Sequence, residues 1–239
     1  MKKALLVLGM LFVMLSAMVL IANAKASAAI SSIVIEKYIG ASGAVCYDKP
    51  VIQTNVWVGW KSGFYVDLWN SSPFKGFNEV YNYGTEADYC IGFSHSLFKS
   101  KTIVDVYLSF CDEPSLGKVN GEDLFYNYLK LSRSTKNMMF WLQYDNVAFT
   151  AASSYNGANR FCIGASATKK LSKLGVTAWV SPVLDTGHGV FLKGEVKAEW
   201  SLTKKFSIVL PGVKWFVPVQ LNDGRIFEKA FYTGFNYSL

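Results

Sequence analysis

Residues 190–202 read VFLKGEVKAEWSL, and this stretch decides the fold class of the chain. Its even-numbered positions are apolar or small from Val190 to Leu202, whereas its odd-numbered positions are charged or polar from Lys193 to Ser201. A period of two separates side chains onto the two faces of a β-strand, while a helix would mix the two sets. The stretch therefore predicts a β-strand with one uniformly apolar face and one charged face.

The same alternation recurs along the chain, most clearly at residues 86–97 and 102–112. Two segments are less regular. Residues 122–132 carry Leu and Tyr on both faces, and Pro211 in residues 206–216 marks an edge or a bulge because proline donates no ladder hydrogen bond. The chain as a whole predicts an all-β protein of about twelve strands, near residues 31–40, 51–60, 64–70, 86–97, 102–112, 122–132, 138–145, 159–168, 175–183, 190–202, 206–216 and 229–239.

The composition narrows the class of protein further. Of the 239 residues, 51% are hydrophobic and 17% are charged, and the formal net charge is +7. The charged fraction is low against the ~25% of soluble domains, which argues against a disordered chain and against a water-soluble enzyme. The lysines are dispersed over turns rather than gathered on one face, so no nucleic-acid partner is expected. The four cysteines lack C-x-x-C spacing, and we expect no metal and no cofactor.

Residues 1–24 are predicted to be a secretory signal peptide. Two lysines precede a long apolar run, and Ala22-Asn23-Ala24 is a small-x-small cleavage pattern. A second such pattern lies at Ala26-Ser27-Ala28, and the apolar run is long enough that an uncleaved anchor is the alternative. Cleavage would leave residues 25–239 as an exported protein of the bacterial cell outer membrane.

Short and long connections alternate between the predicted strands without exception. The short ones lie near residues 61–63, 98–101, 133–137, 169–174 and 203–205, and the long ones near 41–50, 71–85, 113–121, 146–158, 184–189 and 217–228. Transmembrane barrels have this rhythm, with short periplasmic turns and longer extracellular loops. A soluble β-sandwich is the alternative, but it should bury its uniform face rather than expose it. We therefore predict a single antiparallel, up-and-down transmembrane β-barrel over residues 25–239, in contact with outer-membrane lipid.

The C-terminal residues resemble an assembly signal. Phe231, Phe235, Tyr237 and Leu239 alternate with other residues up to the end of the sequence. Outer-membrane barrels typically end in such a strand, which the barrel-assembly machinery reads, although the last residue is normally aromatic rather than leucine. We expect that machinery to be a partner of this chain.

Three motifs stand out between residues 50 and 92. They are Pro50-Val51-Ile52-Gln53, Ser62-Gly63-Phe64-Tyr65 leading to Trp69-Asn70-Ser71, and Glu86-Ala87-Asp88-Tyr89 leading to Gly92. Together they resemble the TorF family of bacterial porin-like proteins, with the best agreement over residues 33–145. The resemblance implies an outer-membrane barrel with a porin-like role. It says little of the solute, because these motifs are structural rather than catalytic, and the four cysteines fall outside the family pattern.

The charged face of the predicted strands would line a pore. The candidate pore-lining residues are Asp67, Glu86, Asp88, Asp105, Asp145, Arg160, Lys193, Glu195, Lys197 and Glu199. Eight strands leave an interior filled by side chains and ~16–18 leave an aqueous channel, so a twelve-stranded barrel would be narrow. Acids outnumber bases, which predicts passive diffusion of small solutes or ions with a modest cation preference. The alternative is that the charged ladder from Lys193 to Glu199 pairs with neighbouring strands and plugs the lumen.

Two other functions are compatible with a barrel of this size. A structural or adhesive barrel would bind a partner through long loops such as residues 71–85, which are rich in aromatic side chains. A lipid-modifying enzyme would need a histidine beside a hydroxyl. Only His95, near a short turn, and His188, in a loop near Ser181, are available, and we predict no enzymatic activity because no catalytic set can be placed together.

Cys90 and Cys111 are candidates for a disulfide. The turn between their strands centres near residue 99.5, so antiparallel partners sum to about 199, and these two cysteines sum to 201. That sum makes them opposite or diagonal neighbours on the charged face, close to the separation that a disulfide needs. Two free thiols are the alternative.

Overall fold

The computed structural model describes residues 26–40, 45–73, 86–97, 101–112, 124–149, 158–221 and 226–239. The predicted signal peptide, residues 1–24, lies outside these ranges. Among the described residues, no helix is long and apolar enough to cross a membrane. The described ranges consist almost entirely of β-strands.

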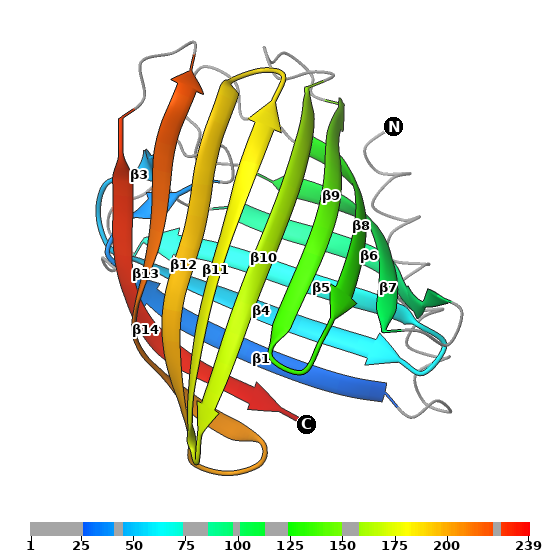
Figure 1. Cartoon of the computed structure of the whole chain (residues 1–239), viewed down its shortest axis with the longest axis vertical. Helices are drawn as coiled ribbons and strands as arrows, with labels where there is room; N and C mark the ends of the chain where they lie inside the picture. Colours follow the sequence, from blue (N-terminus) through cyan, green and yellow to red (C-terminus); the bar gives the residue numbers. More distant parts are fainter. Residues whose placement is uncertain are drawn as a thin grey trace, which may run out of the picture.

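Twelve of the described strands form a closed antiparallel barrel (Figure 1). They are β1 (Ala26–Ile35), β4 (Val51–Trp60), β5 (Phe64–Pro73), β6 (Glu86–Ser96), β7 (Thr102–Asp112), β8 (Leu124–Ser134), β9 (Met138–Phe149), β10 (Asn159–Leu171), β11 (Leu174–Asp185), β12 (Gly189–Ser201), β13 (Phe206–Leu221) and β14 (Glu228–Ser238). The strands follow one another around the wall in chain order, and β1 closes the barrel by pairing with both β4 and β14. The predicted up-and-down, all-β fold is confirmed.

The first barrel strand lies earlier in the chain than residues 31–40, where the alternation placed it. Residues 26–32 contain only alanine, serine and one isoleucine, so they show almost no alternation between hydrophobic and polar side chains. The strand nevertheless pairs along its whole length, from Ala26 opposite Trp60 to Ile35 opposite Val51. The ladder hydrogen bonds, rather than hydrophobic contrast, define this strand.

Two local features of the wall bear on the sequence predictions. β13 accommodates Pro211 through a bulge, since its register with β14 shifts between Val209 and Gly212, and the predicted irregularity is confirmed. The connection predicted as a long loop at residues 184–189 is instead a tight turn. Gly189 makes this turn with a φ of +106°, and a Cβ there would lie 2.2 Å from the carbonyl oxygen of Gln220, so only glycine fits.

The outer and inner faces of the wall differ in chemistry. Outward side chains are apolar and exposed, such as Leu108 at 64% and Val219 at 67%. On the other face, the Tyr65 hydroxyl of β5 donates to Asp105 of β7 over a distance of 2.8 Å, passing across β6. A contact that skips a strand requires a concave surface, so this polar face is the inside of the barrel. An apolar outside is what lipid requires of a spanning barrel.

The two ends of the barrel also differ. One end carries the connections at residues 61–63, 97–101, 135–137, 172–173 and 202–205, and we call it the short-turn end. The opposite end carries those at residues 36–50, 74–85, 113–123, 150–158, 186–188 and 222–227, and we call it the long-loop end. The C-terminus lies at the short-turn end (Figure 1), where the Leu239 amide donates to the Ala28 carbonyl.

The first long connection folds against the inside of the barrel. It contains a separate two-stranded sheet of β2 (Tyr38–Ile39) and β3 (Val45–Tyr47), drawn in blue beside β13 and β14 in Figure 1. The buried apolar cluster that it joins comprises Ile35, Tyr38, Val51, Val209, Ala230 and Tyr232. The β2–β3 hairpin therefore fills one side of the lumen near the long-loop end.

Candidate functional site

A cavity of ≈ 320 Å³ lies inside the barrel against the wall formed by β8 to β12. Its lining consists of Lys130, Met139, Trp141, Gln143, Ser166, Thr177, Trp179, Ser181 and Lys193. These residues share one property: each lies on the inner face of a strand, at positions that alternate with outward apolar side chains. The cavity is thus a part of the lumen that side chains leave unfilled.

Two tryptophans and a lysine shape this cavity. The Trp141 and Trp179 ring centroids lie 6.3 Å apart in an edge-to-face arrangement, and the Lys130 ammonium lies 5.3 Å from the centroid of the Trp141 ring. Gly164, opposite Trp141 on β10, leaves room for that ring, since a Cβ at this position would lie 2.0 Å from it. The absence of a side chain at residue 164 thus provides the space that the Trp141 ring occupies at the edge of the cavity.

Near the long-loop end, the same wall carries a buried charge cluster. The Arg160 guanidinium lies 3.1 Å from Asp185 Oδ2 and 3.8 Å from Asp145 Oδ2. His188 Nδ1 lies 3.2 Å from Asp185 Oδ1, and Gln143 donates to both oxygens of Asp145. The positive guanidinium between two carboxylates compensates the cost of removing these charges from water.

The predicted charged ladder of β12 is divided between two arrangements. Lys197 and Glu199 pair with each other at 2.6 Å, along their own strand. Glu195 instead accepts hydrogen bonds from the Trp179 indole at 2.6 Å and from the Tyr232 hydroxyl. Lys193 faces the cavity. In the described part of the chain, the ladder does not form the continuous set of cross-strand ion pairs that a plug would need.

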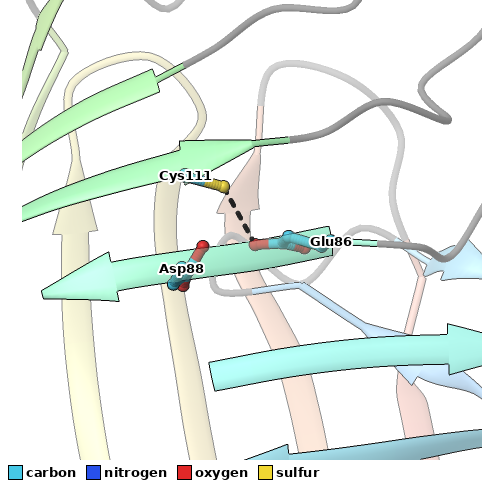
Figure 2. Close-up of side chains that lie close together, drawn as sticks. All are labelled: Glu86, Asp88 and Cys111. Carbon is cyan, nitrogen blue, oxygen red and sulfur yellow. Dashed lines mark hydrogen bonds between the residues drawn. The ribbon is translucent and has the colours of Figure 1, made fainter. Parts of the chain in front are cut away.

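The opposite wall, formed by β4 to β7, is acidic. Glu86 and Asp88 lie on the inner face of β6 near the long-loop end, and Cys111 of β7 projects toward them (Figure 2). The Cys111 thiol donates to Glu86 Oε1 at 3.2 Å, and the Tyr38 hydroxyl of the β2–β3 hairpin donates to Glu86 Oε2. The three candidate ligand atoms of Glu86, Asp88 and Cys111 lie within 4.8 Å of one another, so they could hold a metal ion.

All ten residues predicted to line a pore lie on inner-face positions, and their role in conduction stays a prediction. The sequence analysis did not include Lys130, Asp185 and Lys214, which also face inward. Lys130 was missed because the strand predicted at residues 122–132 carries Leu and Tyr on both faces. Asp185 was missed because residues 184–189 were predicted to be a loop, whereas β11 extends to Asp185. Lys214 follows the bulge in β13, which inverts the expected alternation.

The four cysteines form no disulfide in this structure. The predicted register is confirmed, because Cys90 lies opposite Ser109 and Asp88 opposite Cys111, each pair summing to 199. Cys90 and Cys111 are therefore diagonal neighbours, and their thiols hydrogen-bond elsewhere, to Ser109 Oγ and Glu86 Oε1. The two thiols are not bonded to each other in this structure, and the candidate Cys90–Cys111 disulfide stays a prediction.

The two histidines occupy different surroundings from those of a catalytic pair. His95 stacks on Phe93, with ring centroids 5.8 Å apart, near the short-turn end. His188 was expected in an exposed loop but is only 6% exposed, because the turn folds it onto Asp185. The nearby Ser181 hydroxyl donates to the backbone carbonyl of Ile163.

The residues of the predicted assembly signal lie on β14, at the seam where the barrel closes. Phe231 and Phe235 point outward and are 50% and 39% exposed, while Phe235 lies opposite Ser32 and Tyr237 opposite Ile30 on β1. Their recognition by the assembly machinery remains a prediction. Of the aromatic loop at residues 71–85, residues 74–85 lie outside the described ranges.

A closed barrel with an apolar outside and a polar lumen defines the class of transmembrane β-barrel proteins. Comparison with solved structures finds the same barrel fold. The NanC porin is 12% identical to this chain, the matched region covers 88% of this chain and 100% of NanC, and the TM-score is 0.58. The KdgM porin is 11% identical, with coverage of 88% and 99% and a TM-score of 0.58. KdgM in complex with disordered oligogalacturonate matches with 11% identity, 89% and 99% coverage, and a TM-score of 0.57.

At these identities the likeness shows that the chain shares the porin barrel fold. No family model matches the chain, and no curated protein matches it. The resemblance to the TorF family therefore stays a prediction.

Proposed function

We propose that this chain is an outer-membrane channel for the passive diffusion of small hydrophilic solutes. The observation that carries the proposal is the lumen cavity of ≈ 320 Å³ inside a closed barrel whose outer face is apolar. An apolar exterior suits lipid, and a polar interior with unfilled space suits water and dissolved solutes.

The lining of the cavity supports a preference for hydroxylated solutes. Ser166, Thr177 and Gln143 offer hydrogen-bonding groups, and the rings of Trp141 and Trp179 offer apolar surface. This combination suits sugars, which have both hydroxyl groups and apolar C–H faces. The presence of oligogalacturonate in a KdgM structure is consistent with saccharide passage through a barrel of this fold.

The charges of the inner face support a modest preference for cations. The inward acids of the described strands are Asp67, Glu86, Asp88, Asp105, Asp145, Asp185, Glu195, Glu199 and Glu228, and the inward bases are Lys130, Arg160, Lys170, Lys193, Lys197 and Lys214. Acids outnumber bases, and charge that lines a narrow pore influences which ions enter.

Planar-bilayer recordings of the purified chain test the channel. Wild type should conduct, and Ser166→Trp should reduce single-channel conductance because the indole would occupy the cavity. Ala165→Trp is the matched control, since residue 165 alternates with Ser166 and faces outward. A folded wild-type barrel that passes neither ions in bilayers nor sugars in liposome-swelling assays would refute the proposal.

Export through a cleaved signal peptide is part of the same proposal. Cleavage after Ala24 would leave β1 intact, because β1 begins at Ala26. Cleavage after Ala28 would remove three residues that pair with Trp60, Gly59 and Val58 of β4. N-terminal sequencing of the protein from outer membranes should therefore begin at Lys25, and a start at residue 29 would contradict this assignment.

A further inference from the structure

The corner of the lumen formed by β5, β6 and β7 brings three metal-binding residue types together. Asp88 and Cys111 are direct partners across β6 and β7, and Glu86 lies two residues before Asp88 on the same face. Figure 2 shows the three side chains pointing toward one another at the long-loop end of these strands. Their candidate ligand atoms all lie within 4.8 Å of one another, and Cys111 is only 1% exposed.

The two carboxylates of this corner have no basic partner in the described part of the chain. None of the ion pairs among the described residues includes Glu86 or Asp88. Hydroxyl and thiol donors reach Glu86, but Asp88 Oδ1 is buried and accepts no hydrogen bond in this part of the chain. Two adjacent acids removed from water repel each other, and a positive charge between them would relieve that repulsion.

A second, independent observation comes from β5. Ser71 is 0% exposed and lies directly opposite Glu86 across the β5–β6 ladder, on the same inner face. Its hydroxyl oxygen has no hydrogen-bond partner among the described residues. A buried hydroxyl is normally satisfied, so an unpartnered one beside a carboxylate indicates that something else binds in this corner.

We propose that Glu86, Asp88 and Cys111 bind a zinc ion, with the Ser71 hydroxyl beside the open coordination position. A thiolate ligand favours Zn²⁺ over Mg²⁺ and Ca²⁺, which prefer oxygen ligands alone, and three protein ligands plus an open position is a common zinc arrangement. On binding, the Cys111 S–H bond breaks, its proton passes to solvent, and a sulfur–zinc bond forms. The thiol hydrogen bond to Glu86 is thereby replaced by coordination of both groups to the metal.

The site would tie β6 to β7 at the entrance of the barrel. Because Tyr38 donates to Glu86, the metal would also lie beside the β2–β3 hairpin. It would lower the net negative charge of this corner by about one unit, because the divalent cation adds two positive charges while the Cys111 thiol loses one proton. Zinc occupancy would therefore reduce any cation preference of the channel.

Titration of the full-length, refolded barrel with Zn²⁺ and with Co²⁺ after chelator treatment tests the proposal. Wild type should bind one zinc ion per chain, and Co²⁺ should produce the near-ultraviolet charge-transfer band of a thiolate ligand. Cys111→Ser should abolish that band, whereas Cys90→Ser should keep it, because Cys90 lies on the same face of β6 but hydrogen-bonds to Ser109. Glu86→Gln and Asp88→Asn should weaken zinc binding at least about tenfold.

A measurement on wild type alone keeps the test valid if a variant fails to fold. Isothermal titration in two buffers of different ionisation enthalpy should show net proton release on zinc binding, as deprotonation of a thiol requires. A folded wild type that binds no zinc would overturn the proposal. So would a cobalt band that survives in folded Cys111→Ser, or zinc binding without proton release. Excess Mg²⁺ or Ca²⁺ should leave the cobalt band unchanged, and displacement of Co²⁺ by either would also overturn it.

Discussion

The two inner walls of the barrel differ in how their buried carboxylates are neutralised. On the β8–β12 wall, Asp145 and Asp185 lie on either side of Arg160, within 3.8 Å and 3.1 Å of its guanidinium. On the β4–β7 wall, Glu86 and Asp88 have no basic partner among the described residues, and oxygens of Asp88 and Ser71 lack hydrogen-bond partners there. The carboxylates of the first wall are neutralised by a side chain of the same wall. Those of the second wall require protons, water or a cation from solution to compensate their charge.

Under the proposed channel function, this difference gives the two walls separate roles. A self-neutralised cluster is fixed in place, which suits a wall that has to hold the shape of a solute cavity. A wall with uncompensated acids attracts positive charge, which suits the entrance of a channel. The predictions below test each half of this contrast.

Removal of Arg160 should have the largest effect. Arg160→Met keeps much of the apolar stem but leaves two carboxylates buried without a counter-charge, which typically costs about 3–5 kcal/mol. The midpoint of heat-induced unfolding, read from the gel mobility of folded and unfolded forms, should fall sharply. Lys214→Met is the control, because Lys214 contacts the ring of Tyr232 and forms no ion pair within the described ranges. Equal shifts for the two variants would show that Arg160 does not hold the wall together.

Filling the space beneath Trp141 should have an intermediate effect. In Gly164→Ala the new Cβ would lie 2.0 Å from the indole, so the ring must move and the cavity must change shape. Overpacking of this kind typically costs about 1–3 kcal/mol. Near-ultraviolet circular dichroism should report the displaced indole, and channel conductance should change with it. Gly175→Ala is the matched control, since a Cβ there meets nothing within 4 Å, and an identical response of both variants would contradict the packing argument.

Neutralising the acidic corner should have a smaller effect, confined to ion selectivity. Glu86→Gln and Asp88→Asn each remove an inward negative charge at the long-loop end, so the reversal potential in a salt gradient should move toward zero. The recordings are made with chelator present, which separates selectivity from metal binding. Asp48→Asn removes an exposed acid from the first long connection and should leave the reversal potential nearly unchanged. A larger shift in this control would place the selective charge outside the barrel wall.

The alternation in the sequence correctly predicted which face of a regular strand a side chain occupies. Phe110 and Cys111, for example, fall on opposite faces as expected, because a one-residue step always reverses the direction of a strand side chain. The register of Asp88 with Cys111 also followed, since a short turn determines which residues face each other. The first strand was predicted at residues 31–40 instead of Ala26–Ile35, because alanine and serine at residues 26–32 provide little hydrophobic contrast.

Features that depend on several strands at once were beyond such reasoning. The contacts of Arg160 with Asp145 and Asp185 join three strands, and the spacing of these residues in the sequence does not predict that they meet. The corner of Glu86, Asp88 and Cys111 likewise has no metal-binding motif, since its members meet through sheet pairing rather than through a local turn. The β2–β3 hairpin was missed because strands of two and three residues are too short to show any period.

The smallest expected effect concerns how firmly the β2–β3 hairpin covers the acidic wall. Lys37, at the start of the first long connection, forms an ion pair with Glu228 of β14, and this hydrogen bond raises the pKa of the Lys37 ammonium above its usual value. A raised pKa in the folded state means that the stabilisation is fully present below the ordinary lysine pKa and is lost as pH rises through the folded value. Because the pair is partly exposed, we expect less than about 1 kcal/mol. The unfolding midpoint of wild type should exceed that of Lys37→Met slightly at pH ~9, and the difference should shrink as the pH rises beyond the ordinary lysine pKa of ~10.4. A difference that does not shrink at the higher pH would show that Lys37 acts through packing rather than through its charge.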